Sequence, residues 1–484
     1  MTRRRQTRAT VRLRVCFLVI AFVLSLFAAR LFQLQGIDAN AYAARAVAEG
    51  SRTVPLHAER GEIVDRDGEP LATSVDAVAL TADPTKTAKD ATQIATILVD
   101  TIGLDYFDTV ERLRKPDTRF VYLAHKVPTW KADKAVQRLH DGGYANVFTE
   151  RDTLRTYPGN DLAANVLGLV NNKGEGAAGL ERSFQDELSG KDGSATYEIS
   201  PDGERIPLAD STVSEPEPGI GLRTTLDRDL QWYADRRLKE AVHRTESDWG
   251  VAVTVDLKTM QVLQLSQLPT FNANKPSTIS KDNINLRAIQ NVYEPGSVQK
   301  VVTMAALADA GLVTPQSKIK IPSELQVDDF TIGDYWDHGT IKLTAAGVIA
   351  KSSNLGTVLA SQQMSDEQMY GYLENFGFGS PTDIGLPGES GGILPPADGW
   401  SRSKHATIAF GQGISVTAMQ EVAAVATIAN GGVYTQPSLV SGLIGPDGEV
   451  TPAPAPDQHR VVSTKAADMV TRMMETVTGE DGSA

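Results

Sequence analysis

Two residues three positions apart, Ser297 and Lys300, could together perform acyl transfer. Residues at this spacing lie on the same face of a helix, so the lysine amine can reach the serine hydroxyl. A serine attacks a carbonyl only with the help of a base, and a lysine is a base only when burial or a neighbouring cation keeps it neutral. The pair therefore predicts Ser297 as a nucleophile and Lys300 as its proton acceptor.

The Ser-x-x-Lys spacing is common by itself, since about one or two matches are expected by chance in a chain of this length. Two further matches occur. Ser317 with Lys320 lies in a stretch that contains proline and lysine, and Ser401 with Lys404 lies in sequence that predicts a polar loop. We expect neither to begin an apolar helix. The spacing alone therefore does not identify the nucleophile.

The sequence around Ser297 distinguishes it from these two matches. Pro295-Gly296 predicts a turn directly before the serine, and an apolar helix is predicted from Val298 to Ala310, where a glycine ends it. A helix N-terminus offers free backbone N–H groups and the positive end of the helix dipole, which stabilise an oxyanion. Ser297 could still be only a helix cap, with Lys300 a solvated charge.

A second motif, Ser352-Ser353-Asn354, lies between predicted helical segments. The Ser352 hydroxyl could relay a proton between Lys300 and a leaving amine, and the Asn354 amide can both donate to and accept from a peptide backbone. A serine-rich helix cap is the alternative interpretation of this tripeptide.

Other elements would position these residues. A helix capped by Asp227, an antiparallel hairpin with strands near 251–255 and 262–265, and helical sequence at roughly 340–376 are predicted around the two motifs. Residues 50 to 225 mix short strands, helical patches and turns, which predicts an α+β module. The Ser-, Pro- and Glu-rich stretch 210–219 predicts a linker.

The N-terminus predicts a membrane anchor. Its first fourteen residues contain six arginines and no acid, and the apolar sequence that follows approaches the ~20 residues that cross a bilayer. We predict a cytoplasmic basic tail at 1–14, a single transmembrane helix at 15–34 and an extracytoplasmic remainder in the bacterial cell membrane. A cleaved signal peptide and a buried core helix are the alternatives.

The composition excludes other classes. The net charge is −13, and it becomes −19 without the six N-terminal arginines, so the exported part is a poor nucleic-acid binder. Cys16 is the only cysteine, which excludes an intramolecular disulfide, and the seven histidines lack paired metal-ligand spacing. We predict no metal and no cofactor.

Together the two motifs resemble the penicillin-binding proteins and serine β-lactamases, whose motifs are Ser-x-x-Lys, a Ser-x-Asn element and Lys-Thr-Gly. Further matches resemble the class B penicillin-binding proteins. They are Arg60-Gly61, Asp65-Arg66, Gly68, Leu71-Ala72, Arg155, Tyr157-Pro158, Gly168, Gly179-Leu180-Glu181, Leu188 and Gly190 in the pedestal, Thr224 to Asp227 at the opening of the transpeptidase domain, and Gly411-Gln412-Gly413, Thr417 and Gln420 near its active site.

This resemblance implies an α+β fold with a single N-terminal transmembrane helix. A pedestal of the dimerisation type would occupy 50–215, and a transpeptidase domain would occupy 225–484 as an α/β/α sandwich with an antiparallel central sheet, like the serine β-lactamases.

The activity implied is that of a peptidoglycan D,D-transpeptidase that forms cell-wall cross-links, most similar to the division-specific branch. Its substrates would be stem peptides and their lipid-linked precursor, and β-lactams would acylate the same serine. A membrane glycosyltransferase and divisome proteins are the implied partners.

The implied site has Ser297, Lys300, Ser352 and Asn354 as catalytic residues. The residues implied to contact substrate are Gly296, Ser353, Gly411, Gln412, Gly413 and Thr417.

The chain departs from the family pattern in two places. Val298, Gln299 and Val301 stand where the family usually has Thr, Phe and Pro, and no Lys-Thr-Gly or Lys-Ser-Gly follows Ser352. We expect the sequence to be incomplete before that third motif and the chain as given to be weakly active or inactive. A non-catalytic scaffold is the alternative function, although a scaffold need not keep Lys300 and Asn354.

Overall fold

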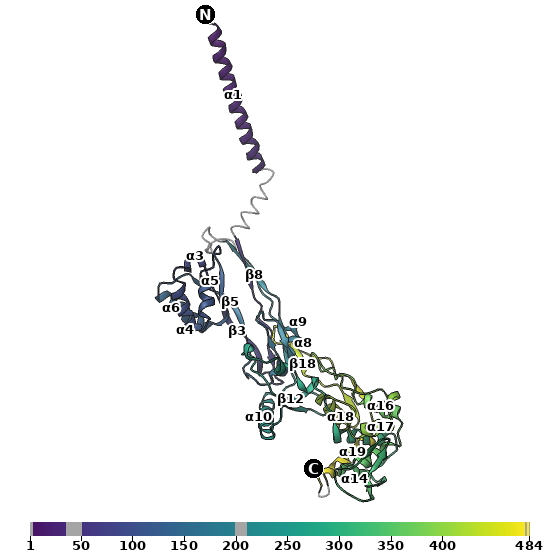
Figure 1. The fold of residues 1–484 in the computed structure, drawn as a ribbon. Helices are drawn as coiled ribbons and strands as arrows, with labels where there is room; N and C mark the ends of the chain where they lie inside the picture. The colour runs from purple at the N-terminus through teal and green to yellow at the C-terminus, as the bar shows by residue number, and fades with distance from the viewer. Residues whose placement is uncertain (1–2, 35–50, 199–210, 480–481, 484) are drawn as a thin grey trace. The chain divides into compact units, whose positions relative to one another are not determined.

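The computed structural model describes residues 3–34, 51–198, 211–479 and 482–483 (Figure 1). Residues 1–2 of the predicted tail, residues 50 and 199–210 of the predicted pedestal, residue 210 of the predicted linker and residues 480, 481 and 484 of the predicted transpeptidase domain lie outside this part.

The N-terminal helix α1 (Arg3–Phe32) begins inside the predicted basic tail and continues through the apolar stretch without a break. Arginine is a good helix former, so the change in polarity near residue 15 does not interrupt the helix. Within Thr10–Phe32 the most apolar stretch of 18 residues has a mean hydropathy of 2.6, and none of that stretch is buried against other parts of the chain. This length and composition suffice to cross a membrane.

The chain divides into two compact units. The first unit contains residues 1–58, 77–152 and 191–217, and the second contains 59–76, 153–190 and 218–484. The two segments 59–76 and 153–190 therefore pack with the transpeptidase half of the chain, although they lie inside the region 50–215 that the sequence assigns to the pedestal.

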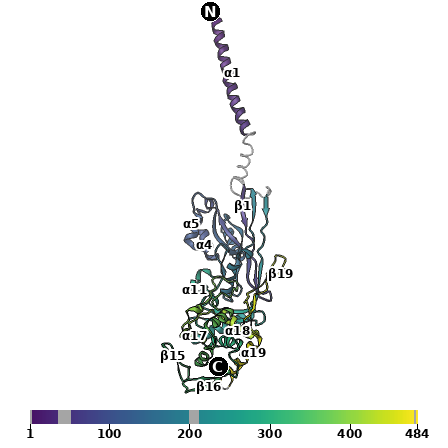
Figure 2. The ribbon, with the colours of Figure 1, turned by 90° about the vertical axis from the view of Figure 1, so that its right-hand side faces the viewer.

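The first unit combines a small antiparallel sheet with a helical layer. The sheet consists of β1 (Ser51–Leu56), β8 (Gly193–Glu198) and β9 (Ser211–Ser214). Strand β9 lies within the predicted linker, so the linker prediction was wrong there, because the polar residues of this segment pair with β8. Figure 2 shows α4 and α5 side by side. The remaining elements are α3 (Pro84–Thr87), α4 (Ala91–Ile102), α5 (Tyr106–Leu113), β4 (Val121–Pro128), α6 (Thr129–Asp141) and the part of β5 (Val147–Thr156) that ends at Asp152.

The second unit begins with a sheet built from segments far apart in sequence. Strand β10 (Gly221–Thr224) pairs in parallel with β2 (Ile63–Val64) and antiparallel with β18 (Val440–Ile444). Next to these lie β19 (Val450–Pro452) and the start of β3 (Pro70–Ala82). Short elements complete this region: α7 (Ala164–Leu167), β6 (Leu169–Val170), β7 (Gly176–Ala178), α8 (Gly179–Ser183) and α9 (Gln185–Leu188).

A hairpin of β11 (Gly250–Val255) and β12 (Val262–Leu268) carries helices on both faces, which fits the predicted sandwich. Strand residues point alternately to opposite faces. On one face Gly250 lies against α10 (Arg228–Thr245), and the Gln231 amide donates to the Ser266 hydroxyl at 3.0 Å. On the other face the β11 valines line a groove with α18 (Ala418–Ala429). The predicted Asp227 cap of α10 is confirmed, since Asp227 accepts the Leu230 N–H at 2.9 Å.

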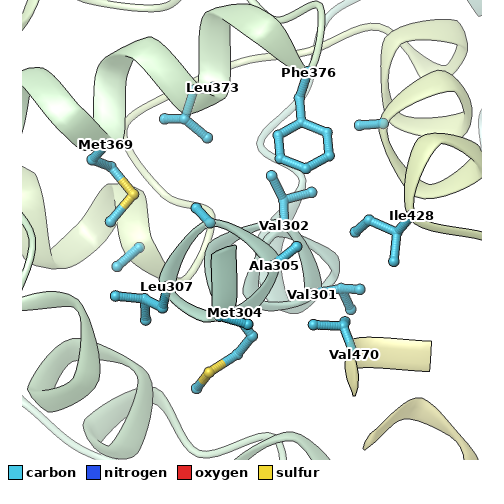
Figure 3. Close-up of a cluster of buried hydrophobic side chains, with 14 of the residues drawn as sticks. Val301, Val302, Met304, Ala305, Leu307, Met369, Leu373, Phe376, Ile428 and Val470 are labelled. Atoms are coloured by element: carbon cyan, nitrogen blue, oxygen red, sulfur yellow. The ribbon is translucent and has the colours of Figure 1, made fainter. Parts of the chain in front are cut away.

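Helix α13 (Gln299–Asp309) is the centre of the largest core of the second unit. Its side chains from Val301 to Leu307 pack against surrounding helices, as Figure 3 shows around Met304 and Ala305. The predicted helix 298–310 is confirmed, with a 3-10 turn at its start. The surrounding helices are α14 (Ala345–Ala350), α15 (Asn354–Ser361), α16 (Asp366–Asn375), α17 (Arg402–Ala409), α18 and α19 (Thr464–Glu475).

The predicted helical region 340–376 was wrong at its start. Strand β16 (Ile341–Thr344) pairs with β13 (Lys318–Ile321), because its apolar and polar residues alternate. The other short elements of the second unit are α11 (Lys281–Ile284), α12 (Arg287–Gln290), β14 (Leu325–Val327), β15 (Phe330–Ile332), β17 (Val433–Thr435) and β20 (Gln458–Arg460).

Candidate active site

Ser297 lies just before the N-terminus of α13, in the 3-10 turn Gly296–Val298 that leads into the helix. The turn begins at Gly296 with φ of +58°, a conformation that favours glycine. Ser297 and Val298 are exposed, whereas every residue from Gln299 to Ala308 is buried. The serine is therefore accessible to a substrate although it is attached to the most buried helix of the unit.

Lys300 is 2% exposed, and its amine lies between the two serine motifs. The Nζ atom donates to Ser297 Oγ at 3.2 Å, to Ser352 Oγ at 3.0 Å and to the Ser352 carbonyl at 2.6 Å. Burial lowers the pKa of Lys300 to about 8, and the negative charge of Asp334 partly opposes this effect. A lowered pKa of this size increases the share of the amine that is neutral near neutral pH. This geometry excludes the reading of Lys300 as a solvated helix charge.

Ser352 occupies the corner between α14 and α15. Its backbone has φ of +50°, an unusual value for a serine. The Ser352 N–H donates to the Ile349 carbonyl at 3.0 Å, and the Ser353 N–H donates to the Val348 carbonyl at 2.9 Å. These bonds turn the chain so that the Ser352 hydroxyl reaches Lys300.

The other two members of the Ser-Ser-Asn motif have different environments. Ser353 is fully buried, and its hydroxyl accepts the Gly356 N–H at 2.9 Å as the cap of α15. It therefore presents no surface to a substrate, which is a correction to its predicted contact. Asn354 is the half-buried first residue of α15, and its amide donates to the Gly333 carbonyl at 3.1 Å.

The loop Gly411-Gln412-Gly413 packs beside the serine turn. The Gly296 N–H donates to the Gly411 carbonyl at 3.0 Å, and the Gly413 N–H donates to the Glu294 carboxylate at 2.7 Å. A Cβ on Gly411 would lie 2.0 Å from the Gly296 oxygen. The predicted residues Gly296, Gly411 and Gly413 are thus brought together, with Gln412 exposed between the two glycines of the loop.

Thr417 lies at the start of α18. It is fully buried, and its hydroxyl accepts the Gln420 N–H at 3.1 Å in a capping box at the start of α18. The predicted contact of Thr417 with a substrate is therefore corrected, because a capping hydroxyl at this depth is already occupied.

The two other Ser-x-x-Lys matches are not built like Ser297. Ser317 accepts the Thr314 N–H at 2.9 Å, and Lys320 lies in strand β13. Ser401 accepts the Lys404 N–H at 3.1 Å as the cap of α17. The prediction of a polar loop at Ser401 was wrong, since this serine starts a helix whose later residues are buried.

The sequence did not indicate Asp334, a residue that contacts the Ser-Ser-Asn motif. Its side chain is 0% exposed, and it accepts hydrogen bonds from Ser353 Oγ at 2.6 Å and from the Leu355 N–H at 3.0 Å. The aromatic residues that follow it, Tyr335 and Trp336, pack edge to face. Nothing in the spacing of these residues connects Asp334 to Ser353, because the contact depends on the tertiary fold.

The chain is similar to known proteins in sequence and in fold. A family model described as penicillin binding protein transpeptidase domain matches residues 250–484, and one described as penicillin-binding protein dimerisation domain matches residues 55–224. Penicillin-binding protein PbpB of Mycobacterium tuberculosis is 35% identical over an alignment of 511 positions, which covers 99% of this chain and 74% of that protein. Peptidoglycan D,D-transpeptidase FtsI of Escherichia coli K12 is 31% identical over 467 residues, with 95% and 75% covered.

Solved structures give the same result. Penicillin binding protein 3 from Mycobacterium tuberculosis, complexed with aztreonam, superposes with a TM-score of 0.68 at 31% identity and covers 89% of this chain and 78% of that one. Penicillin binding protein 2X from Streptococcus thermophilus has a TM-score of 0.71 at 28% identity, with 88% and 66% covered. The chain therefore belongs to the class B penicillin-binding proteins, with their dimerisation and transpeptidase domains.

Proposed function

We propose that the protein is a membrane-anchored peptidoglycan D,D-transpeptidase in which Ser297 forms the acyl-enzyme. The observation that supports this most strongly is the buried Lys300 amine, which donates to the Ser297 and Ser352 hydroxyls at 3.2 and 3.0 Å. A buried lysine with a pKa of about 8 is a base that can accept a hydroxyl proton near neutral pH.

The acylation step follows from this arrangement. Neutral Lys300 takes the proton of Ser297, and the serine oxygen attacks the penultimate D-alanine carbonyl of a stem peptide. Backbone N–H groups at the start of α13 and the helix dipole stabilise the oxyanion. When the carbon–nitrogen bond breaks, the leaving D-alanine amine receives the proton from Lys300 through the Ser352 hydroxyl, and the acyl group stays on Ser297.

The second step reverses these proton transfers. The amine of a neighbouring strand attacks the Ser297 ester and passes one proton to Lys300 by way of Ser352. Lys300 then returns a proton to the departing Ser297 oxygen, so that the amide cross-link forms and the enzyme is restored. The Asn354 amide belongs to the same motif as Ser352 and is suited to hold the peptide backbone of the substrate.

A β-lactam would acylate Ser297 by the first step alone. Its lactam carbonyl takes the place of the D-alanine carbonyl, and the ring nitrogen accepts the proton. The solved structure of a relative complexed with aztreonam supports this proposal.

The location proposed for the reaction is the outer face of the bacterial cell membrane. Helix α1 would span the membrane with its arginine-rich end in the cytoplasm, because positive flanks stay on that side. The substrate source would be the lipid-linked precursor and nascent stem peptides. A membrane glycosyltransferase and the divisome are the proposed partners, since the sequence pattern is most similar to the division-specific branch.

Labelling of the full-length protein with a fluorescent penicillin tests the proposal. Ser297→Ala should abolish labelling, and Lys300→Ala should slow it by about 10² to 10⁴-fold, the usual contribution of general base catalysis. Ser401→Ala is the matched control, because it changes the serine of another Ser-x-x-Lys spacing, and it should label like the wild type. Unchanged labelling of Ser297→Ala would exclude Ser297 as the nucleophile.

A further inference from the structure

The buried carboxylate of Asp334 takes no part in the proton transfers described above, yet it lies directly behind them. It accepts hydrogen bonds from the Ser353 hydroxyl at 2.6 Å, the Leu355 N–H at 3.0 Å and His338 Nε2 at 3.2 Å. Its side chain is 0% exposed and that of His338 is 6% exposed. A carboxylate this deep in a protein requires partners, and Asp334 has three.

These contacts fix the start of α15. Ser353 Oγ accepts the Gly356 N–H and Asp334 accepts the Leu355 N–H, so the two side chains together satisfy two of the free N–H groups of the helix. A negative charge at a helix N-terminus is also stabilised by the helix dipole. Ser352 and Asn354 flank Ser353 in the chain, so the position of both depends on this cap.

His338 also contacts the carboxylate. Its Nε2 atom lies 3.2 Å from Asp334 Oδ2, and its Nδ1 atom lies 2.6 Å from the Gly339 carbonyl. The imidazole therefore serves Asp334 as a hydrogen-bonding partner.

The charge of Asp334 also reaches the active-site lysine. Of the charged groups in the described part of the chain, Asp334 is the one whose field changes the pKa of Lys300, and it raises that pKa against the larger effect of burial. Lys351 adjoins Ser352 in the chain, and Glu294 accepts the Gly413 N–H on the other side of the serine turn. Neither Lys351 nor Glu294 contributes to the shift of the Lys300 pKa.

We propose that Asp334 is a positioning residue of the acylation site, which fixes the corner that carries Ser352 and Asn354 and whose negative charge acts on the Lys300 amine. The proposal rests on the proposed function, in which Lys300 is the base. It assigns two separable effects to one side chain: its hydrogen bonds set the geometry, and its charge opposes the effect of burial on the Lys300 amine.

The pH dependence of acylation separates these two effects. With Lys300 as the base, the acylation rate of the full-length protein with a fluorescent penicillin should rise through an acid limb near pH 8. Asp334→Asn keeps the shape of the side chain but removes the charge that favours protonated Lys300. The acid limb should therefore move to lower pH, by about one unit, and the plateau rate should fall because the corner is held less well.

Two further variants complete the test. Asp337→Asn removes an exposed carboxylate from the same loop and should leave both the limb and the plateau unchanged. Ser353→Ala removes a hydrogen bond to Asp334 but keeps its charge, so it should lower the plateau without moving the limb. Thermal unfolding of each variant shows whether it is folded, and Ser353→Ala still tests the geometric effect if Asp334→Asn does not fold.

An acid limb that stays in place or moves to higher pH in folded Asp334→Asn would overturn the role of the charge. A wild-type plateau in Ser353→Ala would overturn the role of the hydrogen bonds. The proposed function fails in a different way, since a wild-type protein that is not acylated, or that shows no acid limb at all, contradicts Lys300 as the base before any Asp334 variant is compared.

Discussion

At the scale of single residues, the proposed chemistry depends on an amine that is buried and partly neutral. Lys300 is 2% exposed, and its three hydrogen bonds go to Ser297 and Ser352. The sequence predicted this pair because a helix places residues three apart on one face. It could not predict the burial of Ser353 and Thr417, because a cap and a substrate contact require the same type of side chain.

Gln299, between the serine and the lysine, offers a residue-scale prediction about stability. It is 1% exposed, and neither atom of its amide has a hydrogen-bonding partner within the described residues. Burying such a group without partners costs about 1–3 kcal/mol. Gln299→Leu should therefore raise the free energy of unfolding by about 1 kcal/mol while penicillin labelling continues.

Urea unfolding of the two proteins measures this difference. Thr303→Val is the contrasting variant on the same helix, since its hydroxyl donates to the Ala409 carbonyl at 2.8 Å and its loss should destabilise the protein. A Gln299→Leu variant that is less stable than the wild type would show that the amide has a partner in solution.

At the scale of elements, the serine turn is held by a loop more than a hundred residues away in the chain. Gly411 has φ of +89°, and its carbonyl accepts the Gly296 N–H at 3.0 Å. Thr303 connects α13 to the end of α17, directly before the same loop. The position of Ser297 is therefore set jointly by the turn that precedes it and by the loop that packs on that turn.

Gly411→Ala should disturb this contact strongly. The added Cβ would lie 2.0 Å from the Gly296 oxygen, and a positive φ is unfavourable for alanine, so the turn must shift. A displacement of about 1 Å at a reacting group can cost about 10²-fold in rate, and we expect a loss of that size in penicillin acylation. Gly399→Ala, where an added Cβ meets no atom, is the control and should keep the wild-type rate. Equal rates for the two variants would contradict this role of the loop.

Elements with a local signal were predicted well. The Asp227 cap, the β11–β12 hairpin and α13 depend on caps and periodicity within a few residues of sequence. The errors concern segments whose structure depends on a distant partner. Strand β9 pairs with β8 and β16 pairs with β13, and neither partner can be recognised from the composition of the segment itself.

At the scale of the whole chain, the two compact units do not follow the order of the sequence. The pedestal motif residues that the sequence suggested, Arg60, Arg155, Tyr157 and Glu181, meet inside the second unit around one carboxylate. Glu181 is 0% exposed and accepts Arg60 Nε at 2.5 Å, Arg155 Nε at 2.7 Å and the Tyr157 hydroxyl at 3.2 Å. The sequence suggested these four residues, but it did not indicate that Glu181 binds the other three.

Removing that centre should destabilise the second unit. Glu181→Ala leaves two buried guanidinium groups without their carboxylate, and breaking a buried pair in this way costs about 3–5 kcal/mol. The thermal midpoint of the unit should fall accordingly. Glu240→Ala removes an exposed pair with Arg237 in the same unit, in which the two side chains are 63% and 61% exposed, and should leave the midpoint unchanged. Similar midpoints for both variants would contradict a structural role of Glu181.

The central claim is that Ser297 is the residue that becomes acylated. Mass spectrometry of peptides from the full-length protein after reaction with a β-lactam tests it most directly. We predict that the mass of the drug is found on the peptide that contains Ser297 and that it disappears in Lys300→Ala at short reaction times. An adduct on Ser352, Ser401 or any other residue, with Ser297 unmodified, would contradict the account.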